Sequence, residues 1–251
     1  MLSNSKGFIY CTGSQAATTI EHMPPKSMFE AKLRPKGFEY PACAECNNNT
    51  GHSDLVAALL GRCWPNADTD VARTDLIKLL RAVSNNAPAV LLEMDIGRAG
   101  EKMARKRHNI PDDAHPLRAD GPILNKRLQT FAAKLGFALH YEMTGDWIPH
   151  GGGVQVMWFS NVQALNGEIP SILVEGLPTP LTLQQGTKSV ADQFQYSYAR
   201  AEQDHLLYYA SFNLSFAVAG ITALDRSVCL DARAAEFPIF SPGDFRRPIA
   251  T

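Results

Sequence analysis

The stretch "CAECNNNTGHSD", residues 43–54, opens with a Cys-x-x-Cys pair and continues through three asparagines to a histidine. Two thiolates at this spacing can bind one tetrahedral zinc ion. The preceding "FEYPAC" (38–43) is typical of a β-strand, whereas "SDLVAALLGRCW" (53–64) carries apolar residues at helical spacing, with Ser53 in position for an N-cap. The stretch therefore predicts a transition from strand to helix built around two cysteines.

Upstream, "ATTIEHMPPKSMF" (17–29) places Glu21 beside His22, just before two prolines. The preceding "GFIYC" (7–11) is also β-like, so the predicted order is strand, loop, strand and helix. Neighbouring residues on a strand point to opposite faces. Glu21 and His22 can therefore serve one site only where the backbone is irregular, which the two prolines favour.

The chain of 251 residues has 45% hydrophobic and 20% charged residues, as ordinary globular proteins do. Its net charge of −1 excludes a uniformly basic nucleic-acid binder but leaves room for a local patch. One patch is "EKMARKRHN" (101–109), for which a solvated helix face is the simpler interpretation. The sequence has no run of about 18 apolar residues and no leader of basic and then apolar residues, so we expect a cytoplasmic protein without a membrane partner.

The five cysteines are unevenly placed along the chain. Cys63 and Cys229 are isolated and are most simply small core residues. Cys11, Cys43 and Cys46 lie close together in the sequence, which in a cytoplasmic protein indicates metal or redox chemistry before disulfides. Thiol-redox chemistry is the weaker interpretation, because no βαβ pattern surrounds the Cys-x-x-Cys pair.

A zinc site of this kind needs a fourth ligand. The residue three positions before Cys11, where a partner cysteine would stand, is Phe8. Either zinc takes three thiolates and another ligand such as His52, or the cysteine site is vestigial and apolar.

The rest of the chain predicts helices between about residues 70 and 145 and strands between about 154 and 220. The helical stretches are "DVARTDLIKLLRAVSNN" (70–86) and "ILNKRLQTFAAKLGFALHYEMTG" (123–145). The β-like stretches are "VQVMWFS" (154–160), "SILVEG" (171–176), "QFQYSYARAE" (193–202) and "HLLYYASFNLSFAVAG" (205–220). Their short spacing predicts an antiparallel sheet, although the last stretch could instead begin a buried helix near Ala217. The tail after Phe237 is expected to be irregular.

Together, "TTIEHMPPKSMF" (18–29) and "YPACAECNNNTGHSD" (40–54) resemble the HNH endonucleases, or ββα-metal nucleases, of a bacterial group with EHxxPK and PACxxCN segments. The resemblance covers about residues 8–56, and "KLGFALHYEMTGDWIP" (134–149) is also similar to the downstream segment of longer members. It implies an N-terminal ββα-metal module at residues 1–62, which together with the predicted helices and antiparallel strands makes the expected fold α+β. An α+β C-terminal region of unknown role would occupy residues 63–251.

The resemblance also implies an activity, the metal-dependent hydrolysis of phosphodiester bonds in DNA. His22 would be the general base, because a neutral imidazole can accept a proton from water at neutral pH. Glu21 and Asn47 would hold one Mg²⁺ or Mn²⁺ ion through oxygen atoms, with His52 as a further candidate ligand. Two departures are evident: Glu21 replaces the more frequent Asp of the family, and any of three consecutive asparagines could face the ion.

Three cations in the loop between the two halves of the motif, Lys26, Arg34 and Lys36, are candidates for contacts with DNA phosphates. Solvated loop charges are the alternative interpretation. A second functional hypothesis is a catalytically inactive, nuclease-derived module that zinc stabilises and that binds nucleic acid. The cysteine missing at position 8 supports this second hypothesis.

Overall fold

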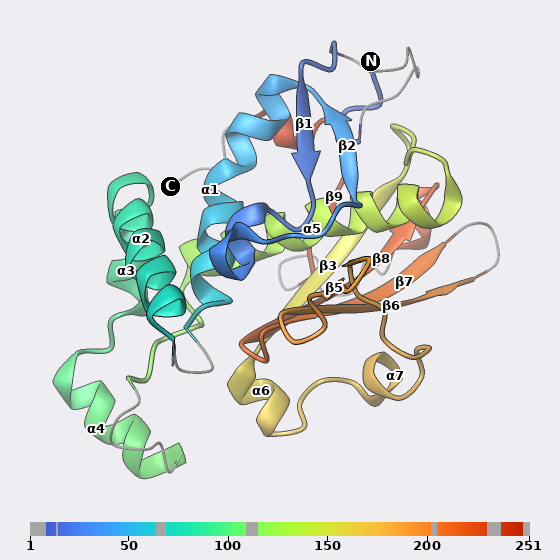
Figure 1. Cartoon of the computed structure of the whole chain (residues 1–251). Helices are drawn as coiled ribbons and strands as arrows, with labels where there is room; N and C mark the ends of the chain where they lie inside the picture. Colours follow the sequence, from blue (N-terminus) through green and yellow to red (C-terminus); the bar gives the residue numbers. More distant parts are fainter. Residues whose placement is uncertain are drawn as a thin grey trace.

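The computed structural model describes residues 9–13, 15–63, 69–108, 115–201, 205–229 and 237–247. Its centre is helix α5 (Pro122–Thr144), which lies between a five-stranded antiparallel sheet on one side and an N-terminal hairpin with helix α1 on the other (Figure 1). The α+β class predicted from the sequence is confirmed at this level. No helix in the described part of the chain is long and apolar enough to cross a membrane.

The N-terminal hairpin pairs β1 (Thr19–His22) with β2 (Glu39–Ala42), and α1 (Ala44–Leu60) follows directly. The two strands are antiparallel, with Glu21 opposite Tyr40 and His22 opposite Glu39. Two 3-10 turns, η1 (Lys26–Met28) and η2 (Glu30–Lys32), lie in the loop between the strands.

Helix α1 begins at Ala44, well before the predicted N-cap at Ser53, so this boundary was wrong. The actual N-cap is Cys43, whose sulfur accepts the backbone N–H of Cys46 at 3.4 Å. Ser53 is buried inside the helix. The sulfur thus caps the first turn, the role that the sequence assigned to a hydroxyl.

Three helices form an arm beside α1: α2 (Asp70–Asn86), α3 (Pro88–Met94) and α4 (Gly97–His108). The predicted helix over residues 70–86 is confirmed, and it starts where the Thr69 side chain accepts the N–H of Ala72. The basic patch lies on α4, which projects from the body at the lower left of Figure 1.

Helix α5 is buried over most of its surface, which suits a helix between two layers. Gly136 allows its close approach to the sheet, since an added Cβ would lie 2.5 Å from Val154 Cγ1 and 2.8 Å from Tyr208 Oη. The Tyr208 hydroxyl donates to the Ala132 carbonyl at 2.8 Å. One continuous buried core therefore joins the hairpin, α1, α5 and the sheet.

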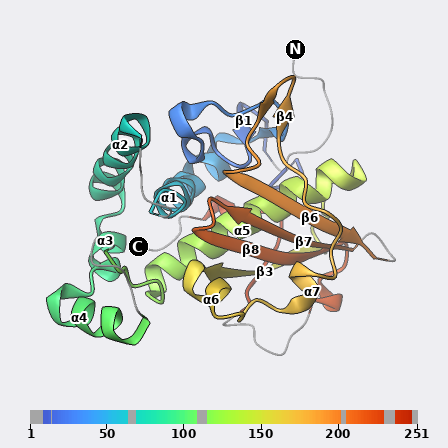
Figure 2. The same cartoon turned by 60° about the horizontal axis from the view of Figure 1, so that its bottom comes forward.

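The sheet has the strand order β6-β7-β8-β3-β9, with every neighbouring pair antiparallel. Its strands are β3 (Gly153–Ser160), β6 (Phe194–Arg200), β7 (Leu206–Phe212), β8 (Phe216–Ala223) and β9 (Ile239–Phe240). Two short helices, α6 (Asn161–Leu165) and α7 (Ser171–Val174), cover the face away from α5 (Figure 2). A small hairpin pairs β4 (Gln184–Gln185) with β5 (Lys188–Ser189).

Most of the predicted strands are confirmed, including a continuous β8 where a helix near Ala217 was the alternative. There are two exceptions: residues 9–11 of "GFIYC" lie in a turn, and "SILVEG" forms α7 directly after Pro170. Ile172 and Val174 of α7 are exposed, so these β-branched residues are not packed in a sheet. The tail after Phe237 is also more regular than expected, because β9 adds an edge strand beside β3.

Candidate functional site

Glu21 and His22 lie on opposite faces of a regular strand. Both pair through β1 with residues of β2, so the irregular backbone expected before the two prolines is absent at this point. The Glu21 side chain points inward and is 4% exposed, whereas the His22 side chain is 27% exposed. The Glu21–His22 pair therefore contributes to two different environments, which corrects the expectation of one shared site.

On the inner face, the Glu21 carboxylate meets a lysine that the sequence did not single out. Lys134 Nζ, from the middle of α5, lies 3.1 Å from Glu21 Oε2 and 2.5 Å from Asp54 Oδ2 of α1. The Lys134 side chain is 0% exposed. The sequence does mark Lys134 as unusual, because it is a lysine within the otherwise apolar run "FAAKLGFAL" (131–139). The neighbouring residues do not identify its partners.

The charges of this inner cluster do not cancel when all three groups are ionised. Two carboxylates and one ammonium would leave a net negative charge. Burial raises the pKa of Asp54 to about 7, although the positive charge of Lys134 acts to lower it. Burial lowers the pKa of Lys134, but Asp54 and Glu21 together raise it above its usual value. Tyr10, whose ring centroid lies 5.7 Å from Lys134 Nζ, keeps a neutral hydroxyl because burial raises its pKa.

On the outer face, His22 lies beside an acid from the neighbouring strand. Its Nε2 is 3.9 Å from Glu39 Oε1, which also lies 3.8 Å from Nη1 of Arg34. Partial burial and the charge of Lys26 lower the pKa of His22 below its usual 6.5, while Glu39 opposes this shift. The imidazole is therefore neutral at pH 7, accessible to solvent, and able to accept a proton.

Arg34 does not have the surface that a phosphate contact requires. Its side chain is 1% exposed, and its guanidinium donates hydrogen bonds to backbone carbonyls of the loop. The five acceptors are the carbonyls of Met23, Pro24, Pro35, Gly37 and Phe38. Arg34 thus organises the loop between β1 and β2, which corrects its predicted role, whereas Lys26 and Lys36 are exposed and remain candidates.

The residues predicted to hold a divalent ion are not gathered at one point. Asn47 Nδ2 donates to Thr19 Oγ1 at 3.2 Å, while His52 is exposed on α1. Of the other two asparagines, Asn49 donates to carbonyls of the C-terminal segment. Because the Glu21 carboxylate is held by Lys134, the predicted set of Glu21, Asn47 and His52 does not fit a divalent ion as the structure places them.

The three clustered cysteines, by contrast, converge as the sequence suggested. In the described part of the chain, they are the one group of three or more His, Cys, Asp or Glu residues that could hold a metal ion. The sulfurs of Cys11, Cys43 and Cys46 all lie within 4.8 Å of one another and are buried. Burial, together with the neighbouring thiol of Cys43, raises the pKa of Cys46 when no metal is bound.

This thiol cluster fits zinc, which prefers thiolate ligands in a closed structural site. His52 does not belong to the cluster, so it is not the fourth ligand in this arrangement. Phe8, the position at which a fourth cysteine would be expected, lies outside the described residues.

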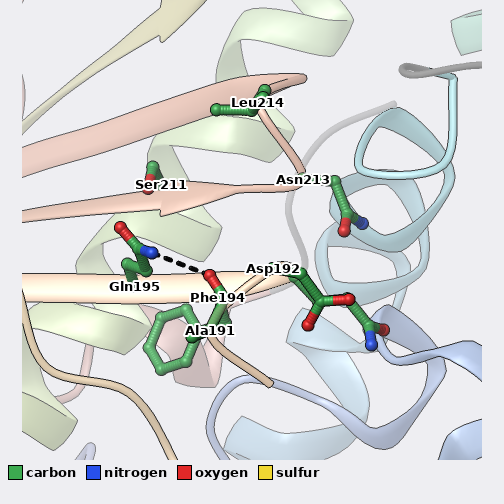
Figure 3. Close-up of a pocket in the computed structure, with 8 residues that line it drawn as sticks. Ala191, Asp192, Phe194, Gln195, Ser211, Asn213 and Leu214 are labelled. Carbon is green, nitrogen blue, oxygen red and sulfur yellow. Dashed lines mark hydrogen bonds between the residues drawn. The ribbon is translucent and has the colours of Figure 1, made fainter. Parts of the chain in front are cut away.

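A pocket of about 280 Å³ lies at the ends of β6 and β7, and none of the predicted site residues lines it (Figure 3). Its polar side chains serve the fold: Gln195 donates to the Ala191 carbonyl at 2.8 Å, and Asn213 donates to the Gly61 carbonyl at 2.6 Å. Gln193 accepts the backbone N–H of Glu30 at 2.8 Å. These contacts tie the sheet to the N-terminal part of the chain and do not form a reactive group.

The geometry therefore offers two buried clusters, of thiols and of charged groups, and one accessible histidine. Comparison of the chain with models of known families, with curated proteins and with solved structures finds no match.

Proposed function

We propose that this chain hydrolyses phosphodiester bonds in DNA, with His22 as the general base. The observation that carries the proposal is the neutral, solvent-accessible imidazole of His22 beside Glu39 on the outer face of the hairpin. The hairpin leads directly into α1 through the thiol cluster, so this surface rests on a support that zinc would make rigid.

The chemical step requires an activated water. The unprotonated ring of His22 takes one proton from water, whose oxygen attacks phosphorus as the bond to the leaving oxygen breaks. The leaving oxygen then takes a proton from solvent. Glu39, 3.9 Å from His22 Nε2, stabilises the imidazolium that forms.

The exposed lysines near His22 are the groups that would bind phosphate. The charge of Lys26 lowers the His22 pKa, which places its ammonium within electrostatic range of the ring. Lys36 is exposed in the same loop. Both can attract a phosphate backbone irrespective of base sequence.

A structural zinc ion and a catalytic divalent ion have to be considered separately. Zinc fits Cys11, Cys43 and Cys46 and would join the N-terminal segment to the start of α1. The Mg²⁺ or Mn²⁺ ion implied by the resemblance does not fit Glu21, Asn47 and His52 as placed, so no step of the reaction is assigned to it.

A second candidate function is a zinc-stabilised module that binds nucleic acid without cutting it. The contact between Glu21 and Lys134 favours this candidate, because it occupies the carboxylate that the resemblance assigns to the catalytic ion. Stoichiometric zinc and DNA binding without cleavage would support it over the nuclease.

The test is the nicking of supercoiled plasmid by the zinc-loaded full chain, with Mg²⁺ and with Mn²⁺. We expect His22→Ala to reduce the nicking rate about 100-fold or more, the usual scale for loss of a general base. His115→Ala is the matched control, since His115 is exposed beside Glu101 and away from the hairpin. Absence of nicking by wild type with every divalent ion, or an unchanged rate in His22→Ala, contradicts the proposal.

A further inference from the structure

The inner face of β1 carries a cation of its own. We propose that Lys134 is the resident counter-cation of Glu21 and Asp54, and that Glu21 acts as a positioning residue for His22 and not as a metal ligand. The positioning role rests on the proposed function, because it supposes that His22 reacts. The role of Lys134 as counter-cation does not depend on catalysis.

The ammonium occupies the place that a shared metal ion would need. Lys134 reaches from α5 to a point between β1 and α1, where its Nζ lies 3.1 Å from Glu21 Oε2 and 2.5 Å from Asp54 Oδ2. A divalent ion shared by these two carboxylates would need the same point, since it too must approach an oxygen of each. The ammonium excludes such an ion by its volume and by its charge.

Little of the charged cluster reaches solvent, although the Asp54 side chain is 13% exposed. Lys134 and Glu21 are buried, and the ring of Tyr10 lies on another side of the ammonium. A buried charge is tolerated only with a compensating partner. The carboxylates therefore depend on Lys134 as much as Lys134 depends on them, and the three form one unit across β1, α1 and α5.

A backbone contact connects this unit to His22. Glu21 Oε1 accepts the backbone N–H of His22 at 3.1 Å, while its Oε2 faces Lys134. Because side chains alternate along β1, fixing Glu21 inward fixes His22 outward, opposite Glu39. Lys134 thus acts on His22 through Glu21. The contact also links the EH segment to "KLGFALHYEMTGDWIP" (134–149), the second stretch in which this chain resembles HNH proteins.

The counter-cation role is tested by counting Mn²⁺ bound to the zinc-loaded full chain, by electron paramagnetic resonance of the free ion. We expect Glu21→Gln to leave Mn²⁺ binding of the chain unchanged. We expect Lys134→Ala to gain one site, and the double variant Lys134→Ala/Glu21→Gln to lose that gain. One Mn²⁺ on wild type that Glu21→Gln removes would overturn the inference, and this comparison needs no change at Lys134.

The positioning role is tested by the pKa of the His22 ring, followed by nuclear magnetic resonance. Lys134→Met leaves the charge of Glu21 uncompensated, so the His22 pKa should shift upward, whereas Lys134→Arg should hold it near the wild-type value. The triple variant Glu21→Gln/Asp54→Asn/Lys134→Met replaces the three charged groups by neutral ones. It should fold, and its His22 pKa should not shift upward. A His22 pKa that is the same in wild type, Lys134→Met and this triple variant would overturn the positioning role.

Neither measurement uses DNA cleavage, so the two proposals can fail separately. If wild type does not nick while the Mn²⁺ and His22 results are as expected, the nuclease proposal fails and the assignment of Lys134 as counter-cation stands. If His22→Ala abolishes nicking while wild type binds a Glu21-dependent Mn²⁺, the nuclease proposal stands and the assignment of Lys134 is overturned.

Discussion

Two buried clusters support the first half of the chain, and they differ in where their positive charge comes from. The thiol cluster of Cys11, Cys43 and Cys46 brings together three potential anions, and Arg246, which lies within electrostatic range of Cys11 and Cys46, is partly exposed and paired with Glu45. The charged cluster of Glu21, Asp54 and Lys134 has its cation built in. The same hairpin and helix thus carry one cluster that suits an external metal ion and one that already contains its counter-ion.

An acidic residue in a segment that only resembles a metal-nuclease motif is therefore not enough to identify a metal ligand. A carboxylate can bind a divalent ion only while its oxygen atoms are available. A buried carboxylate needs a compensating partner inside the protein, and that partner occupies its oxygens. Glu21 has one oxygen toward Lys134 and the other toward the backbone of His22. The three thiol sulfurs lie within 4.8 Å of one another, an arrangement that could hold a metal ion.

Removing zinc should have the largest effect on folding stability. We expect about one zinc per chain by elemental analysis, and a loss on the order of 5 kcal/mol or more in the free energy of unfolding on chelation, since metal binding adds to folding. Cys46→Ser should lose the zinc, whereas Cys229→Ser, at another buried cysteine, should keep it. If wild type contains no zinc and a chelator leaves unfolding unchanged, the thiol cluster is an apolar packing element and the contrast between the two clusters disappears.

Removing the internal cation should have the next largest effect. Lys134→Met leaves the buried Glu21 carboxylate without its cation and removes the hydrogen-bond partner of Asp54, which should lower the free energy of unfolding by about 3–5 kcal/mol in urea denaturation. Lys78→Met is the control, because Lys78 is exposed in a surface pair with Asp75. The triple variant with Glu21→Gln and Asp54→Asn should recover most of the loss. Equal stability of Lys134→Met and wild type would show that the carboxylates are not held as charges.

The charged cluster should also make stability depend on pH. The pKa of Asp54 is raised from 3.8 to about 7, so between these values the folded chain holds a proton that the unfolded chain has released. Stability from this group is complete below pH 3.8 and is lost as the pH rises through about 7. The slope approaches roughly 1.4 kcal/mol per pH unit for one proton.

Urea denaturation between pH 4 and pH 8 measures this loss. Asp54→Asn should flatten the dependence, while Asp70→Asn, at an exposed residue, should leave it as in wild type. A wild-type dependence that survives in Asp54→Asn would assign the proton to another group. The thiol cluster should respond in the opposite sense, because thiolates bind zinc more strongly as the pH rises.

The sequence predicted the thiol cluster better than the charged cluster, because two of the thiols are close together along the chain and the charged residues are far apart. Cys43 and Cys46 are neighbours on one helical turn, so their spacing alone brings them together. Lys134 lies 80 residues after Asp54, and only the packing of α5 on α1 joins them. Local patterns carry no information about such a contact.

The fold shows the same division. Periodicity predicted α2, α5 and the main strands, because their patterns are long and regular. It missed the start of α1, which a cysteine sulfur caps, and it assigned a strand to α7, where Pro170 starts a helix. The β-like stretch "GFIYC" does not supply the first strand, since its residues 9–11 lie in a turn, and the regular pairing of β1 further along separates Glu21 from His22.

The smallest expected effect concerns the outer face of β1, where His22 has exposed charges on either side. Glu39 raises the His22 pKa and Lys26 lowers it. We therefore expect Glu39→Gln to lower this pKa further and Lys26→Gln to raise it. Each change should be a few tenths of a unit, because solvent screens these pairs. Nuclear magnetic resonance of the ring measures both shifts, with Lys36→Gln, at another exposed lysine of the same loop, as the control. If nicking depends on His22 as a base, the midpoint of its pH profile should move with the ring pKa in each variant. Shifts of the ring pKa without matching shifts of the nicking profile would separate His22 from the chemical step, and would favour the binding module over the nuclease.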